Sequence, residues 1–185
     1  MPRSMFTNRS QASITPRFSL SYGFFDYLCR GLTAGMKRLI LPNQAFFELA
    51  EQMLRQGNKV EITVKGQSMR PFLLNGEKVT VVPVSSPGEL RKGTIILAKT
   101  LHGVTVMHRI HEVEDNLILM KGDGNIDQTE PVLPADVLGI VSSIHRNGRE
   151  ISPYTLPRRI GAKIWRNRLI RRIGLRLYRY IVTTR

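Results

Sequence analysis

The sequence contains a single cysteine, Cys29, among its 185 residues. A lone cysteine cannot form an intrachain disulfide, so nothing here argues for an oxidising compartment. The sequence also lacks a run of about eighteen apolar residues, the length that a transmembrane helix requires. The closest stretch, 18–41, is interrupted by charged residues such as Asp26, Arg30 and Lys37. We therefore expect a protein that is cytoplasmic or peripheral at a membrane.

The N-terminal region lacks the apolar segment of a signal peptide. Ser/Thr-rich residues 4–15 separate its basic start from any apolar stretch. We expect residues 1–41 to form a disordered or weakly ordered leader. The sequence Met36-Lys37-Arg38 resembles a natural start of translation, so the alternative is that residues 1–35 reflect the choice of start site.

Acidic residues are scarce. The chain has 14 Asp and Glu against 28 Lys and Arg, for a net charge of +14, and residues 151–185 hold ten basic residues and no acid. This balance predicts an anionic partner, either a membrane surface or nucleic acid. Nucleic acid is disfavoured because the sequence has no helix-turn-helix, zinc spacing or RNA-binding motif. We expect no cofactor and no metal.

Apolar residues at three- and four-residue spacing predict an amphipathic helix over 42–57. Pro42 suits a first helical position, and Gly57 with Asn58 ends the pattern. The period then changes to two, as in Val60, Ile62 and beyond. Hairpin turns at 115–116 and 147–148 complete a pattern that predicts one compact, mostly antiparallel β domain over 58–151.

The C-terminal region begins with an expected linker, 152–157, which contains Pro153 and Pro157. A basic amphipathic helix is predicted over 158–185, because apolar residues recur there at four-residue spacing between arginines. This helix could bind an anionic bilayer or another acidic partner. The alternative is a helix packed on the β domain with its basic face in solvent.

Ser68 lies in a loop that opens on Gly66 and closes on Pro71, just after the strand 59–64. A serine hydroxyl is a weak nucleophile until a neighbouring base takes its proton. Gly66 allows close approach of the backbone, and the Ser68 N–H is a candidate donor to an oxyanion. The alternative is an ordinary turn serine.

His108, forty residues after Ser68, is the candidate base. The near-neutral pKa of a histidine suits a general base at neutral pH. Apolar neighbours share its face of the predicted strand, so the alternative is a packed core histidine. Asp123 and Asp127 follow in a glycine-flanked loop, and either could orient His108. The alternative for the aspartates is an Asx turn.

Five segments between residues 59 and 145 resemble, in the same order, the conserved boxes of type I signal peptidases and their relatives in the S24/S26 peptidase group. The segments are 66–79 for the serine box, 91–96 for the following strand, 106–110 for the base, 121–127 for the acid and 137–141 for the closing strand.

The resemblance implies a mainly β fold, a small antiparallel signal-peptidase/LexA-like β domain, flanked here by the N-terminal helix and the basic C-terminal helix. It implies cleavage of a peptide bond by Ser68, with His108 as the base. Histidine at the base position is similar to the endoplasmic-reticulum and archaeal enzymes, whereas most bacterial enzymes and the LexA-like branch use lysine. Asp123 or Asp127 would orient the base.

The sequence departs from the family pattern in three respects. A short amphipathic helix stands where a membrane anchor is usual, Glu77 and Thr94 replace aspartates, and Gly66 offers no side-chain donor to an oxyanion. These departures concern the substrate and membrane topology more than the chemistry.

The sequence thus predicts a serine-type endopeptidase of the signal-peptidase-like kind that cleaves a peptide or a precursor protein. One alternative is a non-catalytic β domain attached to a membrane or an acidic partner by its basic helix. A second is a LexA-like self-cleaving protein, because Ala34-Gly35 lies upstream of Ser68. The substrate, the cleavage motif and the oligomeric state do not follow from the sequence.

Overall fold

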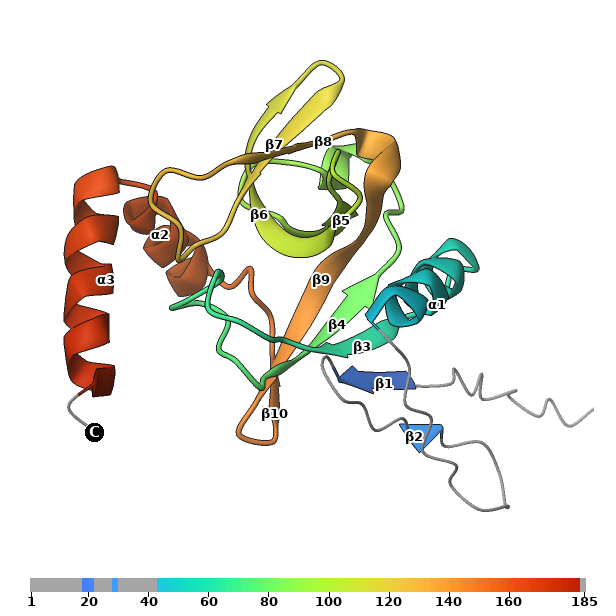
Figure 1. Ribbon diagram of the computed structural model, residues 1–185, viewed down its shortest axis with the longest axis horizontal. Coiled ribbons are helices and arrows are strands. Elements are labelled where there is room, and N and C mark those ends of the chain that lie inside the picture. Colours follow the sequence, from blue (N-terminus) through green and yellow to red (C-terminus); the bar gives the residue numbers. More distant parts are fainter. Residues whose placement is uncertain (1–17, 22–27, 30–42, 184–185) are drawn as a thin grey trace, which may run out of the picture.

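The computed structural model describes residues 18–21, 28–29 and 43–183 (Figure 1). Most of the expected leader, including Met36 and the dipeptide Ala34-Gly35, lies outside the described residues. The predictions made for these positions therefore stay predictions.

The ten described strands form one sheet, which curves into a half-barrel (Figure 1). The strands are β1 (Phe18–Ser21), β2 (Leu28–Cys29), β3 (Val60–Thr63), β4 (Lys78–Val82), β5 (Ile95–Lys99), β6 (Thr105–Glu114), β7 (Leu117–Lys121), β8 (Glu130–Val132), β9 (Val137–Arg146) and β10 (Arg149–Ile151). Their order is β2-β1-β3-β4-β9-β5-β6-β7-β8, with β10 paired to β9. All pairs are antiparallel except β1 with β3. The predicted fold class is confirmed.

Helix α1 (Asn43–Arg55) lies against β3 and β9. Its spacing places Phe46, Ala50 and Leu54 on one buried face. Gly139 of β9 lies beneath this helix, where a Cβ atom would be 3.3 Å from Leu54 Cδ2 and 2.6 Å from the Val82 carbonyl oxygen of β4. The burial of this apolar face holds the helix on the sheet.

Two hydrophobic clusters fill the domain. The first lies between α1 and the strands β3, β4 and β9, and it includes Met69 and Leu73 from the segment after β3. The second lies among β5, β6, β7 and β9 and includes Ile96 and Ile110. Because the segment that carries Ser68 contributes side chains to the first cluster, its position is set by the core.

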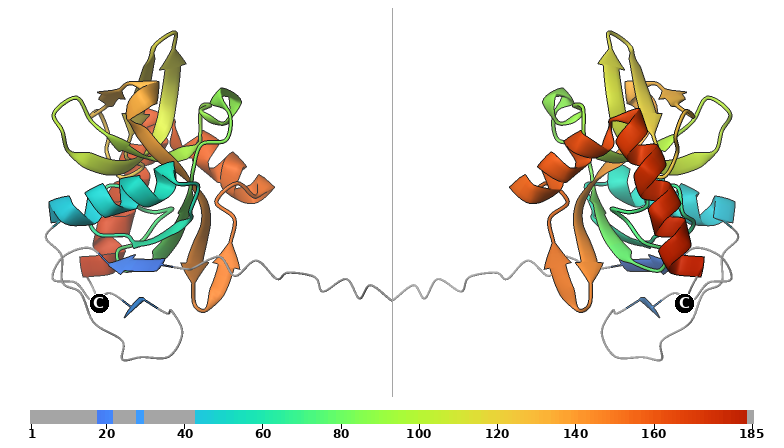
Figure 2. Two further views of the ribbon diagram at one scale, coloured as in Figure 1. Left: turned by 90° about the vertical axis from the view of Figure 1, so that its right-hand side faces the viewer. Right: turned by 90° about the vertical axis from the view of Figure 1, so that its left-hand side faces the viewer.

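The C-terminal region forms two helices, α2 (Leu156–Trp165) and α3 (Arg168–Thr183), and Figure 2 shows them at an angle to each other. The prediction of one helix over 158–185 after a linker is wrong in this respect. Asn167 begins the second helix, since its Oδ1 atom accepts from Leu169 N at 2.9 Å. Pro157 starts the first helix rather than breaking one.

Candidate active site

The turn that carries Ser68 connects β3 to β4. Val64 N donates to Glu77 O at 2.7 Å at its base, and Arg70 N donates to Gln67 O at 3.1 Å within it. Gly66 has a φ of +94°, a conformation that favours glycine. Buried Met69, next to Ser68, anchors the turn in the core. These features hold Ser68, which is half-buried, in a defined place at the edge of the half-barrel.

His108 lies on β6 and is only 5% exposed. Its Nδ1 atom lies 2.5 Å from Oε2 of Glu130, so the carboxylate fixes the orientation of the ring. A Cβ atom added to Gly122 would lie 3.1 Å from His108 Nε2 and 2.5 Å from the Ser68 carbonyl oxygen. The Nε2 atom and the Ser68 backbone therefore meet around Gly122, and the imidazole nitrogen not engaged by Glu130 is the one near the serine.

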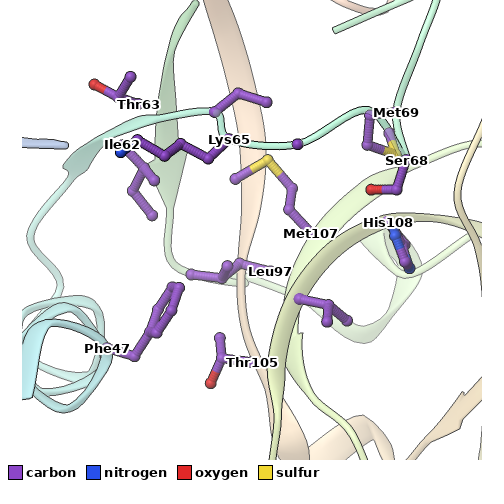
Figure 3. A pocket seen from close by; sticks show the side chains of 13 residues that line it. Phe47, Ile62, Thr63, Lys65, Ser68, Met69, Leu97, Thr105, Met107 and His108 are labelled. Carbon is purple, nitrogen blue, oxygen red and sulfur yellow. The ribbon is translucent and has the colours of Figure 1, made fainter. Parts of the chain in front are cut away.

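Figure 3 shows the side chains of Ser68 and His108 beside each other, although Ser68 comes from the turn after β3 and His108 from β6. Both line the same pocket. Within the described part of the chain, no hydrogen bond joins the Ser68 hydroxyl to the ring. Catalytic hydrogen bonds of this kind are often long without substrate and tighten when it binds. The structure thus brings together the predicted nucleophile and the predicted base.

The residue that contacts the base is Glu130, which the sequence analysis missed. Glu130 pairs with Met120 across β7 and β8, and Met120 pairs with Ile110 across β6 and β7. Ile110 shares a face of β6 with His108, because side chains two residues apart point the same way. The signal that could have identified Glu130 is the pairing register of β6, β7 and β8. Reading that register from the sequence requires recognising the short strand β8.

Asp123 and Asp127 do not contact His108, which corrects the prediction that one of them orients it. Asp123 is buried and forms a two-point ion pair with Arg109, at 2.9 Å from Nε and 2.8 Å from Nη2. Arg109 follows His108 on β6 and so points to the opposite face of the strand. Asp127 is exposed and pairs with Arg168 at 3.0 Å. Both aspartates thus have structural partners.

The loop 122–125 lies directly against the serine turn. Gly124 N donates to Ser68 O at 2.6 Å. A Cβ atom at Gly124 would lie 2.6 Å from Gln67 O, and one at Gly122 would lie 2.5 Å from Ser68 O. Only residues without side chains allow this approach, which explains why glycines stand on both sides of Asp123.

The C-terminal helices hold the other side of this loop. Trp165 Nε1 donates to Asp123 O at 2.7 Å, and Arg171 Nη1 donates to Asn125 O at 2.8 Å. Gly174 allows α3 to pass close to the Trp165 ring, since a Cβ atom there would lie 2.5 Å from it. The loop beside Ser68 is therefore enclosed between the serine turn and the two helices.

Two of the departures from the family pattern have structural roles. Glu77 accepts from Leu74 N at 2.8 Å and forms an ion pair with Arg146, which ties the end of the serine segment to β9. Arg146 also donates to Phe72 O at 3.1 Å. Thr94 donates its hydroxyl to Glu89 O at 2.9 Å, at the start of β5.

Cationic side chains surround His111 of β6. Burial and the nearby charges of Lys121, Lys92 and Arg171 lower the pKa of His111. Burial, followed by Arg171, lowers the pKa of Lys121. His111 is therefore held in its neutral form more strongly than a free histidine.

A pocket of about 150 Å³ opens beside Ser68 and His108 (Figure 3). Its walls come from α1, from residues 62–66 and from residues 105–107, and its lining is largely apolar. The apolar side chains that Figure 3 labels are Phe47, Ile62, Met69, Leu97 and Met107. Such a lining can accept an apolar side chain of a bound peptide. Within the described residues, no group of acidic, histidine or cysteine side chains gathers to hold a metal ion.

The half-barrel has the LexA/signal-peptidase-like serine peptidase fold. The profile of the family described as Peptidase S24-like matches residues 28–141, which is more than half of the chain. The chain belongs to this family. A search of curated proteins found no match. Among the described helices, none has the length and apolar character needed to cross a bilayer.

Proposed function

We propose that this protein is a serine endopeptidase in which Ser68 is the nucleophile, His108 is the general base and Glu130 orients the base. The observation that carries the proposal is the contact between His108 Nδ1 and Glu130 Oε2, with Nε2 beside the serine turn. The membership of the chain in the S24-like peptidase family supports the same chemistry.

In the proposed mechanism, the Ser68 hydroxyl oxygen attacks the carbonyl carbon of the scissile peptide bond while its proton passes to His108 Nε2. Glu130 accepts the Nδ1–H hydrogen bond and stabilises the imidazolium that forms. The Ser68 N–H faces the developing oxyanion. The tetrahedral intermediate then expels the amine, which takes the proton from His108. His108 Nε2 then takes a proton from water as the water oxygen attacks the acyl carbon, and the bond to the Ser68 oxygen breaks while that oxygen takes the proton from His108, which releases the acid.

The substrate would bind in an extended conformation beside the serine turn. The pairing of β1 with β3 ends at Thr63, and the next residues, 64–66, line the pocket together with residues 105–107. A peptide added along this segment would place one side chain in the apolar pocket next to Ser68. The pocket volume of about 150 Å³ favours a small or medium apolar residue before the cleaved bond.

Digestion of a peptide library, with mass spectrometry of the products, tests this proposal. The wild type is expected to produce new termini that share a small or medium apolar residue before the cut. The variants Ser68→Ala and His108→Ala are expected to give none of these products, while both retain the circular dichroism spectrum of the wild type. Cleavage by Ser68→Ala at the wild-type rate would overturn the proposal.

A further inference from the structure

The two C-terminal helices carry most of the exposed apolar surface of the protein. Seven of the eleven large hydrophobic side chains that are exposed among the described residues belong to α2 and α3. Six of them are at least half exposed and recur at four-residue spacing, as Leu156, Ile160 and Ile164 on α2 and Leu169, Ile173 and Leu177 on α3. Each helix thus presents an apolar stripe that the half-barrel leaves uncovered.

Basic side chains flank both stripes. Residues 151–185 contain ten basic residues and no acid. Of the basic residues on the described parts of α2 and α3, only Arg168 forms a salt bridge, and Arg171 is buried against the site loop. Arg159, Lys163, Arg172 and Arg176 are exposed and present their charge to the surroundings. The occupant of this surface must therefore accept apolar groups and positive charge together.

The cationic surface continues beyond the helices. A cleft of about 790 Å³ is lined on one side by α2, including Leu156 and Ile160 of its stripe, and on the other by residues that include Val82, Ile140 and Tyr154. Arg91 and Lys92, which precede β5, line it together with Arg159 and Lys163 of α2. The charge thus spreads across the α2 side of the half-barrel, as an extended anionic surface requires.

We propose that α2 and α3 dock on the surface of an anionic phospholipid bilayer. The apolar stripes would enter the interface while the flanking arginines meet lipid phosphates. A second copy of the chain fits this surface poorly, because a net charge of +14 on each copy opposes contact between two arginine-rich faces. Charge complementarity favours the bilayer.

The docking surface is connected to the candidate active site. Trp165, at the end of α2, and Arg171, on α3, hold the backbone of the loop that packs against Ser68. A bilayer under α2 and α3 would therefore fix the orientation of the site relative to the membrane. The proposal goes beyond the peptidase chemistry and does not depend on it.

Co-sedimentation with lipid vesicles tests the proposal on the full-length protein. The wild type is expected to bind vesicles of equal parts phosphatidylglycerol and phosphatidylcholine, to bind pure phosphatidylcholine at least tenfold more weakly, and to dissociate as salt rises. Ser68→Ala is expected to bind as the wild type does, which separates this test from that of the peptidase. Failure of the wild type to bind the anionic vesicles overturns the proposal.

Matched variants locate the surface. The pair Ile173→Ser and Leu177→Ser removes part of one stripe, and Leu101→Ser with Val104→Ser removes exposed apolar groups from the β5–β6 turn instead. The first pair is expected to weaken binding at least tenfold, and the second pair to leave it unchanged. An equal loss of vesicle binding in the two double variants would contradict the assignment of the docking surface to α2 and α3.

Charge variants provide an independent readout. Arg172→Gln with Arg176→Gln is expected to weaken binding about 25-fold, since each basic residue near an anionic surface contributes about fivefold. Lys99→Gln with Arg149→Gln removes two exposed bases from the sheet and is expected to have little effect. Sedimentation velocity without lipid is expected to show a monomer. A dimer that Ile173→Ser dissociates would identify a second copy as the occupant and overturn the proposal.

Discussion

The Nδ1 atom of His108 lies 2.5 Å from Oε2 of Glu130, across the intervening strand β7. The contact joins a buried ring to a carboxylate that is itself partly exposed. It directs the remaining ring nitrogen toward the turn that carries Ser68. If this contact orients the base, then Glu130, rather than either predicted aspartate, is the acid on which the reaction depends.

Glu130→Gln is therefore expected to lower kcat by roughly 10²-fold or more, because an amide cannot stabilise the imidazolium as a carboxylate does. Asp127→Asn is the matched control, since Asp127 contacts only exposed Arg168 among the described salt bridges. It is expected to keep at least half of the wild-type kcat. Steady-state kinetics on a cleaved library peptide measure both. The reverse ranking of the two variants would return the orienting role to Asp127.

The Asp123 carboxylate is expected to matter for stability. Asp123→Asn leaves Arg109 buried without its charged partner, which should lower the free energy of unfolding by about 3 kcal/mol. Asp127→Asn breaks a pair whose aspartate is 63% exposed and should cost less than about 1 kcal/mol. Urea denaturation compares them. Equal stability of the two variants would show that the Arg109 pair contributes little.

The glycines of the loop 122–125 set how closely it approaches the serine turn. Gly122→Ala and Gly124→Ala each place a methyl group within 2.6 Å of a carbonyl oxygen. Each is expected to destabilise the protein by about 1–3 kcal/mol and to lower kcat/KM by about 10²-fold. Gly88→Ala, where a Cβ atom meets nothing within 4 Å, is the control and should change neither. Wild-type kinetics in both loop variants would rule out a tight loop–turn contact.

Much of this arrangement could be predicted because it depends on local pattern. The period of two predicts the strands, and the four-residue spacing places Phe46 and Ala50 on the buried face of α1. The order of the sequence boxes led to Ser68 and His108, which the structure brings together at one pocket. The division of the C-terminal region at Asn167 depends on a cap and on the contact of Gly174 with Trp165, which the repeat of apolar residues does not reveal.

The contact of Glu130 with His108 could not be predicted from spacing alone. It depends on the register of three strands, and β8 is short and contains Pro131, which weakens its sequence signal. Asp123 is a candidate acid from sequence because it lies in a glycine-flanked loop after a strand and because 121–127 resembles the acidic box. Those glycines instead allow the loop to approach Ser68, while Arg109 engages the carboxylate.

The environment of His111 predicts how the stability of the protein depends on pH. Its pKa in the folded protein is lowered by burial and by Lys121 and Lys92, so the unfolded chain takes up a proton first as pH falls. The free energy of unfolding should therefore decrease as pH drops below about 6.5, the ordinary pKa of histidine. His111→Gln removes this pH-dependent loss of stability. The free energy of unfolding of the variant relative to the wild type should therefore rise as pH falls. Urea titrations at a series of pH values measure both free energies of unfolding. A difference between them that does not change with pH would contradict the lowered pKa of His111.

Labelling with a serine-directed fluorophosphonate tests the central claim most directly. After incubation and proteolysis, mass spectrometry is expected to find one adduct, on the peptide that contains Ser68, in the wild type. Ser68→Ala and His108→Ala are expected to remain unlabelled, and Glu130→Gln to label at least tenfold more slowly. Equal labelling of wild type, Ser68→Ala and His108→Ala would contradict the assignment of Ser68 as an activated nucleophile.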